Sequence, residues 1–507
     1  MAENVKQFHC VWPYGLKGLV LTAAALFFFF FLVACAALLN WVDIPLIRGT
    51  AFGQATFTSP SSNIHGERII YPLNCSDYVN SAQKCPDNYP SVFEPGESTS
   101  ESCPDYFRWI HQDLKPWETS GITKEMIERG IPGADNRLVI VNGSVYLEKY
   151  RPSFQTRDLF TIWGILQLLR LYPGKIPDLD LLLFTGDTTV VMKRDYEGPN
   201  ATSPPPVFHY CGDKGSLDIM FPDWTFWGWP EVNIRPWEQT LRAIKEGEER
   251  IKWEEREPYA YWRGNPSVAA DRVDLLKCNR SDENEWNVRV YTQDWSKEIG
   301  QGFRNSKLED QCTHRYKIYI EGGTWSVSEK YIFACDSMTL MIKPVYYDFF
   351  SRSMMPMQHF WPIRNNNKCR DIKFAVEWGN NHTREAQVIG KEGSKYIEEI
   401  LAMRNVYDYM FHLLNEYAKL LRFKPTIPPK AQRVCAKSMA CSKSNKDLGK
   451  EFMVQSMVKS PSDKLPCTLP PPYEPEAIRA SLEEKEKITK QVETWEAEYW
   501  EKLNKKQ

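Results

Sequence analysis

Residues 315–335 read RYKIYIEGGTWSVSEKYIFAC, which is a strand pattern, a Gly-Gly loop and a helix pattern in direct succession. The apolar and aromatic side chains from Arg315 to Ile320 predict a short strand, and the run from Ser326 to Cys335 has helical spacing. Strand, loop and helix in this order form the repeating unit of α/β proteins with parallel strands. The stretch therefore predicts an α/β fold for the region around it.

The same alternation continues on both sides of this unit. A hairpin is predicted at 137–147, turning at Asn142-Gly143, because Asn-Gly favours a tight two-residue turn. Further strands are predicted at 179–184, 258–262 and 339–345, and helical spacing covers 160–171, 236–256 and 392–421, the last as one long helix or two. At 507 residues the chain is too long for one ordinary core, so we expect two such sheets between residues 120 and 405.

The composition is that of a globular protein. Hydrophobic residues make up 42% of the chain, charged residues 25%, and the formal net charge is -2. This balance gives no electrostatic attraction towards nucleic acid, and no clustered basic tail supplies one. We therefore expect no nucleic-acid partner.

A single apolar run near the N-terminus predicts a membrane span. Residues 18–39 read GLVLTAAALFFFFFLVACAALL, without a charge. The length matches the roughly 20 residues that a helix needs to cross a bilayer, whereas a cleaved signal peptide has an apolar region of about 7–15 residues. Ala34-Cys35-Ala36 resembles a cleavage site but lies inside the run. Because Lys6 and Lys17 precede the span, we expect an uncleaved signal-anchor with its N-terminus in the cytosol, a type II topology.

Sequons and cysteines beyond this run agree with a lumenal location. Five Asn-x-Ser/Thr sequons follow it and are expected glycosylation sites, at Asn74, Asn142, Asn200, Asn279 and Asn381. Of the 13 cysteines, all except Cys10 and Cys35 lie after the run, as is typical of an oxidising compartment. Their odd number leaves at least one thiol unpaired. No C-x-x-C or H-E-x-x-H occurs, so we expect no zinc site.

Composition also indicates where the chain divides. Ser, Pro, Gly and Asn are frequent at 40–102, and alternating Glu and Lys predict a solvated helix from about Glu476 to Leu503. We expect Trp495, Tyr499 and Trp500 to dock one face of that helix on the body. The predicted organisation is a cytosolic tail (1–17), a transmembrane signal-anchor (18–39), a stem (40–102), an N-terminal domain (103–257), a C-terminal domain (258–425) and a Cys- and Pro-containing tail with the charged helix (426–507).

Carboxylates follow or precede one predicted strand. Asp187 comes after LDLLLF and Thr185-Gly186, the position where α/β sheets collect ligands. It is either a general base that deprotonates an acceptor hydroxyl or a turn residue that caps the next element. Asp178-Leu179-Asp180 resembles a metal-binding D-x-D triplet, but such triplets are common by chance and we expect a structural role.

Two other strand ends have the composition of phosphate sites. The first carries Arg263, Gly264 and Asn265, followed by Arg272; glycine allows close approach, and guanidinium groups bind diphosphate bidentately. A helix from about Ala269 would add its N-terminal amides. The second is the loop from Glu321 to Lys330, which joins strand to helix through two Gly and several hydroxyls. The alternative for either Arg is an ion pair with a nearby carboxylate.

An aromatic segment at 221–230 reads FPDWTFWGWP. Such a density of rings either fills a core or forms a platform for a sugar or an acceptor, and core packing is the commoner use. Within the segment we expect Trp227 and Trp229 to be the exposed rings that contact an acceptor.

These segments together resemble glycosyltransferase family 90, the group of Rumi-type protein O-glucosyltransferases and capsule-associated xylosyltransferases. The resemblance rests on KIPDLD (175–180) with Asp187, DIMFPDWTFW (218–227), YWRG (261–264), and Tyr316-Lys317 through Gly322 to SVSEK (326–330). CPDYF (103–107) and SVSEKY (326–331) are similar to the large plant branch. The match runs in consistent order over about 103–425.

The resemblance implies a GT-B fold of two facing Rossmann-like domains, a UDP-sugar donor carrying glucose or xylose, inversion at the anomeric carbon and no essential metal. It implies that Asp187 is the catalytic base and that a disulfide joins Cys312 and Cys335. The donor-binding residues it implies are Arg263, Gly264, Asn265, Arg272, Gly322, Ser326, Ser328 and Lys330. The acceptor is expected to be a hydroxyl of a protein or a polysaccharide.

Two features depart from the family pattern. Ser328 stands where Rumi-type enzymes have a phosphate-binding Arg, so either Lys330 or Arg272 binds the diphosphate or the donor contact is weaker. The signal-anchor and the ending NKKQ (504–507), without an endoplasmic-reticulum retention signal, favour the Golgi membrane over the endoplasmic reticulum. The alternative function is a noncatalytic carbohydrate-binding or scaffolding protein on a decayed transferase fold. A nucleotide-dependent oxidoreductase is disfavoured because no G-x-G-x-x-G follows a strand.

Overall fold

The structure is a computed structural model of the chain, and it describes residues 71, 73–75, 85, 101–198, 202–282, 284–444 and 446–505. These residues belong to one compact unit that runs from Arg68 to Gln507. The apolar run at 18–39, predicted to be a signal-anchor, lies outside the described residues. Among the helices that are described, none combines the length and the apolar character needed to cross a bilayer.

The first sheet contains six strands in the order β11-β2-β1-β3-β4-β5. Their bounds are β1 Asn136–Val141, β2 Ser144–Lys149, β3 Leu179–Leu183, β4 Val207–His209, β5 Ile219–Met220 and β11 Gln432–Val434. The predicted hairpin is confirmed as β1 and β2, which pair antiparallel, and both Asn142 (φ 49°) and Gly143 (φ 69°) have the left-handed conformation of its turn. Only β3, β4 and β5 are parallel, because β1 also runs antiparallel to β3.

The second sheet is entirely parallel, in the order β10-β9-β8-β6-β7. Its strands are β6 Glu257–Gly264, β7 Val288–Thr292, β8 His314–Tyr319, β9 Met338–Ile342 and β10 Trp361–Ile363. The predicted strands at 258–262, 315–320 and 339–345 correspond to β6, β8 and β9. All five residues of β9 are buried, which is typical of a parallel strand covered on both faces. The α/β prediction is confirmed, with one mixed and one parallel sheet.

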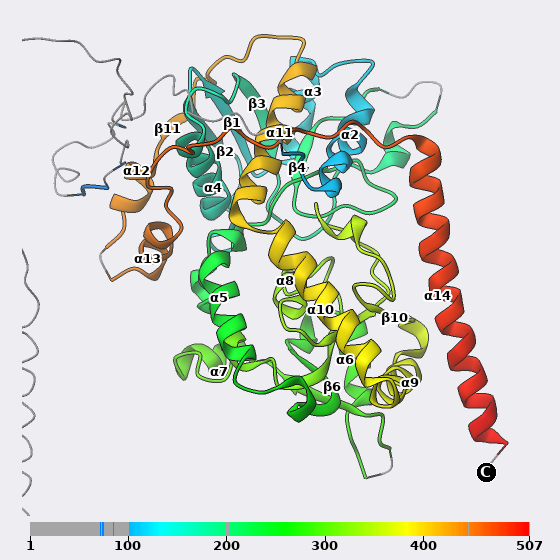
Figure 1. Ribbon diagram of the computed structural model, residues 1–507. Helices are drawn as coiled ribbons and strands as arrows, with labels where there is room; N and C mark the ends of the chain where they lie inside the picture. Colours follow the sequence, from blue (N-terminus) through cyan, green and yellow to red (C-terminus); the bar gives the residue numbers. More distant parts are fainter. Residues whose placement is uncertain are drawn as a thin grey trace, which may run out of the picture. The chain divides into compact units, whose positions relative to one another are not determined.

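Thirteen α-helices lie within the described residues, and they surround both sheets (Figure 1). Their bounds are α2 Trp109–Leu114, α3 Lys124–Gly130, α4 Arg157–Leu171, α5 Trp237–Glu248, α6 Ala270–Leu275, α7 Trp295–Gly300, α8 Glu329–Phe333, α9 Lys368–Asn381, α10 Thr383–Ile400, α11 Met403–Leu420, α12 Ala436–Cys441, α13 Leu448–Gln455 and α14 Pro475–Asn504. The long helical pattern at 392–421 forms two helices, because the chain turns at Leu401–Ala402 between α10 and α11. Helices α9 and α10 pack on the second sheet, and α11 packs on α2 and α4.

The segment after residue 425 returns to the body of the protein. Strand β11 extends the first sheet beside β2, α12 follows it, and α13 packs on α12 (Figure 1). Three disulfides join this segment to the residues before the first sheet: Cys75–Cys441, Cys85–Cys435 and Cys103–Cys467. Each closes a loop of 350 residues or more, so the two ends of the described region are covalently fixed together.

Helix α14 then runs along the second half as a single long helix (Figure 1). The predicted docking face exists: Val492 is buried against the second core, and the hydroxyl of Tyr499 donates to Glu377 on α9. Trp500 stacks near Arg370, at 4.4 Å from guanidinium carbon to ring centre. Trp495 is instead 37% exposed and takes little part in the docking.

Candidate active site between the two sheets

The loop after β3 carries Asp187 and is fixed through its main chain. Its three consecutive carbonyl groups each contact a different side chain: that of Thr185 accepts from Arg157 Nη1 (3.3 Å), that of Gly186 lies 3.0 Å from His209 Nε2, and that of Asp187 accepts from Thr324 Oγ1 (2.6 Å). Buried carbonyl groups need such partners, so the contacts hold the loop in one conformation. The loop therefore presents Asp187 in a defined position.

The carboxylate of Asp187 is accessible and is held from one side. Its side chain is 57% exposed, and Oδ1 accepts a 2.7 Å ion-pair hydrogen bond from Arg157 Nη1, whose own side chain is only 8% exposed. The Arg157 guanidinium also contacts the rings of Phe154 (5.0 Å to the ring centre) and Trp224 (4.5 Å). Oδ2 has no hydrogen-bond partner within the described part of the chain, so it is free to accept a proton from a bound hydroxyl.

The D-x-D triplet that precedes this loop has the structural role that we expected. Asp180 is fully buried in β3 and forms two hydrogen bonds with Arg137 on β1, at 2.8 and 2.7 Å. Asp178 Oδ1 accepts a hydrogen bond from the amide of Asn142 in the hairpin turn. Both carboxylates thus stabilise the first sheet.

Across from this loop, Arg272 on α6 forms the centre of a second group of residues. Its guanidinium donates to four uncharged oxygens: the carbonyls of Asn265 (3.3 Å), Ile320 (3.3 Å) and Glu321 (2.8 Å) and the hydroxyl of Ser326 (3.1 Å). The side chain therefore lies at the carboxyl ends of β6 and β8, where parallel sheets bind ligands.

The positive charge of Arg272 has no carboxylate partner among the described residues. Arg272 is 8% exposed, and burial lowers the pKa of its guanidinium. The neighbouring Glu321 contributes only its carbonyl, because its carboxylate accepts from the amides of Val345 and Tyr346. A buried cation surrounded by neutral acceptors is stabilised by a bound anion, and a guanidinium suits phosphate oxygens.

The loop from Glu321 to Ser328 supplies the groups beside this cation. Gly322 lies close to the guanidinium: a β-carbon there would come within 3.6 Å of Arg272 Nη2. The hydroxyls of Ser326 and Ser328 are 2.8 Å apart, so Ser328 reaches Arg272 through Ser326. Four of the predicted donor-binding residues, Arg272, Gly322, Ser326 and Ser328, are thus brought together.

Lys330 was also predicted to bind the donor, and the structure corrects this assignment. It lies on α8 but is only 2% exposed, and Nζ forms an ion pair with Asp223 (3.0 Å) and a hydrogen bond with Thr225 (2.7 Å). A lysine whose charge is already matched by a buried carboxylate has little to offer a diphosphate. Of the two cations that the sequence left open, Arg272 has the geometry of an anion ligand.

Arg263, Gly264 and Asn265 lie at the end of β6, next to β7. The side chain of Asn265 caps the following turn by accepting from the amide of Ser267, and its carbonyl contacts Arg272. Arg263 instead points towards β7, where Nη1 donates to Gln293 (3.3 Å) and the guanidinium faces the ring of Tyr291. Arg263 therefore borders the Arg272 site without joining its hydrogen bonds.

The aromatic segment fills the core for the most part. Trp227, which we expected to be exposed, is fully buried beneath Gly164 of α4, and its indole N–H donates to Tyr407. The absence of a β-carbon at Gly164 makes room for the ring, and this fit could not be read from the segment itself. Trp229 is half-buried, packs edge-on against Trp224 and donates to Gln155, so it alone of the two retains an accessible face.

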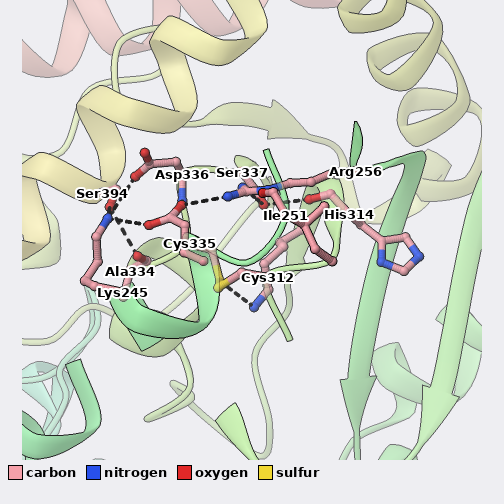
Figure 2. A network of polar contacts seen from close by, with 12 residues as sticks. Lys245, Ile251, Arg256, Cys312, His314, Ala334, Cys335, Asp336, Ser337 and Ser394 are labelled. Atoms are coloured by element: carbon pink, nitrogen blue, oxygen red, sulfur yellow. Dashed lines mark hydrogen bonds and ion pairs between the residues drawn. A yellow bond between two sulfur atoms is a disulfide. The ribbon is translucent and has the colours of Figure 1, made fainter. Parts of the chain in front are cut away.

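A disulfide and a polar network support α8, the helix that follows the Gly322–Ser328 loop. Cys312 and Cys335 are joined, which links the start of β8 to the end of α8. Around this bond, Lys245 pairs with Asp336 (3.0 Å) and donates to Ser394, and Ser337 donates to the carbonyl of His314 (Figure 2). The turn between α8 and β9 is therefore fixed, and with it the Gly322–Ser328 loop.

The remaining cysteine and the sequons have varied surroundings. Cys211 is the free thiol among the described residues, as the odd number of cysteines required, and it is buried behind Asp187. Asn74, Asn142 and Asn381 are exposed, whereas Asn279 is half-buried with its amide bonded to Val290. Asn200 lies outside the described residues.

Three residues that hold the Asp187 loop were missed by the sequence reasoning. Arg157 and His209 come from α4 and β4 and belong to no motif, whereas Thr324 lies in the predicted loop from Glu321 to Lys330 but was not expected to contact Asp187. The sequence offered one signal for two of them: Arg157 stands just before a predicted helix and Thr324 just after a predicted strand, positions from which a cation and a hydroxyl can bind carbonyl groups. Their meeting depends on how the two sheets face each other.

An accessible carboxylate follows a strand of the first sheet, and a guanidinium without a carboxylate partner among the described residues lies at the strand ends of the second. These features define an α/β protein with a candidate ligand site at the carboxyl ends of its strands. The chain belongs to glycosyl transferase family 90, whose model matches residues 98–496.

Named relatives agree with this family. The chain is 25% identical over 387 residues to the O-glucosyltransferase rumi homolog of Anopheles gambiae, covering 74% of this chain and 92% of the relative. It is 25% identical to O-glucosyltransferase rumi of Drosophila melanogaster (67% and 82% covered) and 24% identical to human Protein O-glucosyltransferase 1 (69% and 87% covered). The family match at 98–496 spans both sheets and both halves of the candidate site.

Proposed function

We propose that this protein is an inverting, UDP-sugar-dependent glycosyltransferase that moves glucose or xylose to a hydroxyl group of a protein or polysaccharide acceptor. The observation that carries the proposal is the pairing of two sites: the free Oδ2 of Asp187 on the first sheet, and the buried Arg272 guanidinium without a carboxylate on the second. The names of the relatives support a glucosyl donor and a protein acceptor. The fold is then a GT-B arrangement of two facing Rossmann-like domains.

In the proposed reaction the acceptor hydroxyl gives its proton to Oδ2 of Asp187 while its oxygen attacks the anomeric carbon. The bond between that carbon and the diphosphate oxygen breaks on the opposite face, and UDP leaves with the electron pair. Arg272 and the hydroxyls of Ser326 and Ser328 stabilise the negative charge that develops on the diphosphate. Arg157 keeps the carboxylate oriented by binding Oδ1.

The decisive experiment measures UDP release by the purified lumenal part against a panel of UDP-sugars. The wild-type protein should release UDP with one donor, and Asp187→Asn should lose about 10²–10⁴-fold in rate because the amide cannot accept the proton. Binding of UDP should persist in the variant. UDP binding without transfer or hydrolysis by the wild type would support the noncatalytic carbohydrate-binding alternative instead.

We also propose that the protein is a glycosylated single-pass type II protein of the Golgi membrane. The uncharged run at 18–39 and the sequons that follow it support this placement. Endoglycosidase treatment should increase the gel mobility of the full-length protein, and alkaline carbonate should leave it in the membrane fraction. A mature product that begins near Ala37 would contradict the signal-anchor.

A further inference from the structure

The two loops of the candidate site are joined by one hydrogen bond. Thr324 belongs to the loop that follows β8 of the second sheet, and its hydroxyl donates to the carbonyl of Asp187 on the first sheet, at 2.6 Å. Thr324 is 2% exposed, so water does not compete for this bond. A shielded hydrogen bond of this kind transmits the position of one loop to the other.

Thr324 is also fixed relative to the guanidinium of Arg272. On one side of it, the carbonyl of Glu321 accepts from Arg272 Nε (2.8 Å), and on the other, the hydroxyl of Ser326 accepts from Nη2 (3.1 Å). The amide of Gly322 donates to the carbonyl of Thr324 itself (2.8 Å), which closes a tight turn. An anion that rearranges the contacts of Arg272 therefore acts directly on the turn that carries Thr324.

On the side of the base, Thr324 is the contact that comes from the other sheet. Arg157 and His209, which contact the carbonyls of Thr185 and Gly186, both belong to the first half of the chain. The carbonyl of Asp187 has one further neighbour, the thiol of Cys211 at 3.6 Å, and a thiol is a weak donor. The orientation of the Asp187 main chain thus depends on the second sheet through Thr324.

We propose that Thr324 is a positioning residue, which couples the occupancy of the donor diphosphate site to the placement of Asp187. The inference rests on the proposed function and adds an order to it: the donor binds first, its diphosphate sets the turn at 322–326, and Thr324 then fixes the base for the acceptor. Trp325, the next residue, packs against the rings of His209 and Tyr210 and strengthens the same contact between the loops.

The first test separates turnover from donor affinity. Thr324→Val keeps the shape of the side chain and removes the hydroxyl that donates to the carbonyl of Asp187. It should therefore lower kcat by about 10- to 100-fold, the loss expected when a catalytic group moves by up to about 1 Å. The Kd for UDP should change by less than about twofold, because no group on the diphosphate is lost. Thr324→Ser keeps the hydroxyl and should restore most of kcat.

Thr339→Val is the matched control. The hydroxyl of Thr339 in β9 is buried, and it has no hydrogen-bond partner within the described residues, so its removal should leave kcat unchanged. An active wild type whose kcat is equally insensitive to Thr324→Val would overturn the inference while leaving the proposed function intact. A wild type that transfers from no donor would overturn both.

The second test detects the coupling without catalysis. Hydrogen exchange of the peptide that spans 185–190 should slow when UDP is added to the wild type and to Thr324→Ser. In Thr324→Val the protection should stop at the donor loop, at 321–328. Protection of 185–190 that is identical in wild type and Thr324→Val would also overturn the inference, even if the rates differ.

Discussion

At the scale of single residues, the charge state of a few buried side chains decides what the site binds. Arg272 and Lys330 lie in the same half of the chain and are both more than nine-tenths buried, yet only Lys330 has a carboxylate partner. Burial lowers the pKa of the Arg272 guanidinium, and no carboxylate among the described residues lies beside it to offset this effect. The difference predicts which cation a diphosphate will seek.

Replacing Arg272 should therefore weaken nucleotide binding. Hydrogen bonds to charged groups contribute about 1.5–3 kcal/mol, so Arg272→Ala should raise the Kd for UDP by about 10- to 100-fold, measured by titration calorimetry. Arg289→Ala is the control, because that guanidinium is paired with Glu285 and stacked on Tyr259. Unchanged UDP affinity in Arg272→Ala would remove Arg272 from the site.

A buried histidine makes the fold sensitive to acid. Burial lowers the pKa of His359 to about 4, and its Nδ1 accepts a hydrogen bond from the amide of Met355, which protonation would break. An unfolded histidine titrates near pKa 6.5, so the unfolded state takes up this proton first as the pH falls. The contribution of neutral His359 is thus complete above pH 6.5 and is lost between pH 6.5 and 4.

The melting temperature of the wild type should fall over that range. His359→Gln keeps an acceptor for Met355 but does not titrate, so it should lose less stability between pH 6.5 and 4, as measured by scanning calorimetry. An equal fall in melting temperature in the two proteins would show that His359 has the same pKa in the folded and the unfolded state.

At the scale of elements, α8 is attached to the first half by a buried ion pair. Lys330 on α8 reaches Asp223 and Thr225 in the aromatic segment, and both charged side chains are 6% exposed or less. Removing one partner of a buried pair leaves the other charge uncompensated, which costs about 3–5 kcal/mol. The pair therefore fixes how the helix after the donor loop meets the first sheet.

Lys330→Met should accordingly lower the free energy of unfolding by about 3–5 kcal/mol in urea denaturation. Adding Asp223→Asn removes the carboxylate charge that Lys330→Met leaves unpaired, and the amide oxygen can still accept from the amide of Thr225. The double variant should therefore recover part of the lost free energy of unfolding. If Lys330→Met instead kept full stability and raised the KM for the donor, Lys330 would be a donor ligand after all.

At the scale of the whole described unit, α14 packs against the outer surface of the second half of the chain. Val492 is 4% exposed in the second core, and Glu496 pairs with Arg364, which also binds Asp371 of α9. Val492→Asp would place an unpaired carboxylate in that core and should undock the helix. Limited proteolysis should then cleave within 475–505, whereas Lys487→Asp on the exposed face should leave it protected.

Because no hydrogen bond or ion pair joins α14 to Arg272 or Asp187 in the described part of the chain, UDP affinity should stay near the wild-type value in Val492→Asp. Equal protease resistance of the two variants would mean that α14 is held by contacts other than its apolar face.

The elements that depend on neighbouring residues alone could be predicted before the structure was known. The Asn142-Gly143 turn, the mostly apolar β3 and β9, the strand-to-helix unit at 315–335 and the end of β3 shortly before Asp187 all follow from nearest-neighbour patterns, and so does the α/β class. The short strands β4, β5, β7 and β10 were not predicted, because two to five residues carry too little periodicity to distinguish them from loop.

The tertiary structure alone decided which side chains share a site. Trp227 is buried because Gly164 leaves space for its ring, and the charge of Lys330 is paired because Asp223 meets it from the other half of the chain. Thr324 contacts Asp187 across 137 residues of sequence. Such contacts depend on the packing of two sheets against each other, a long-range free energy that no local pattern of residues contains.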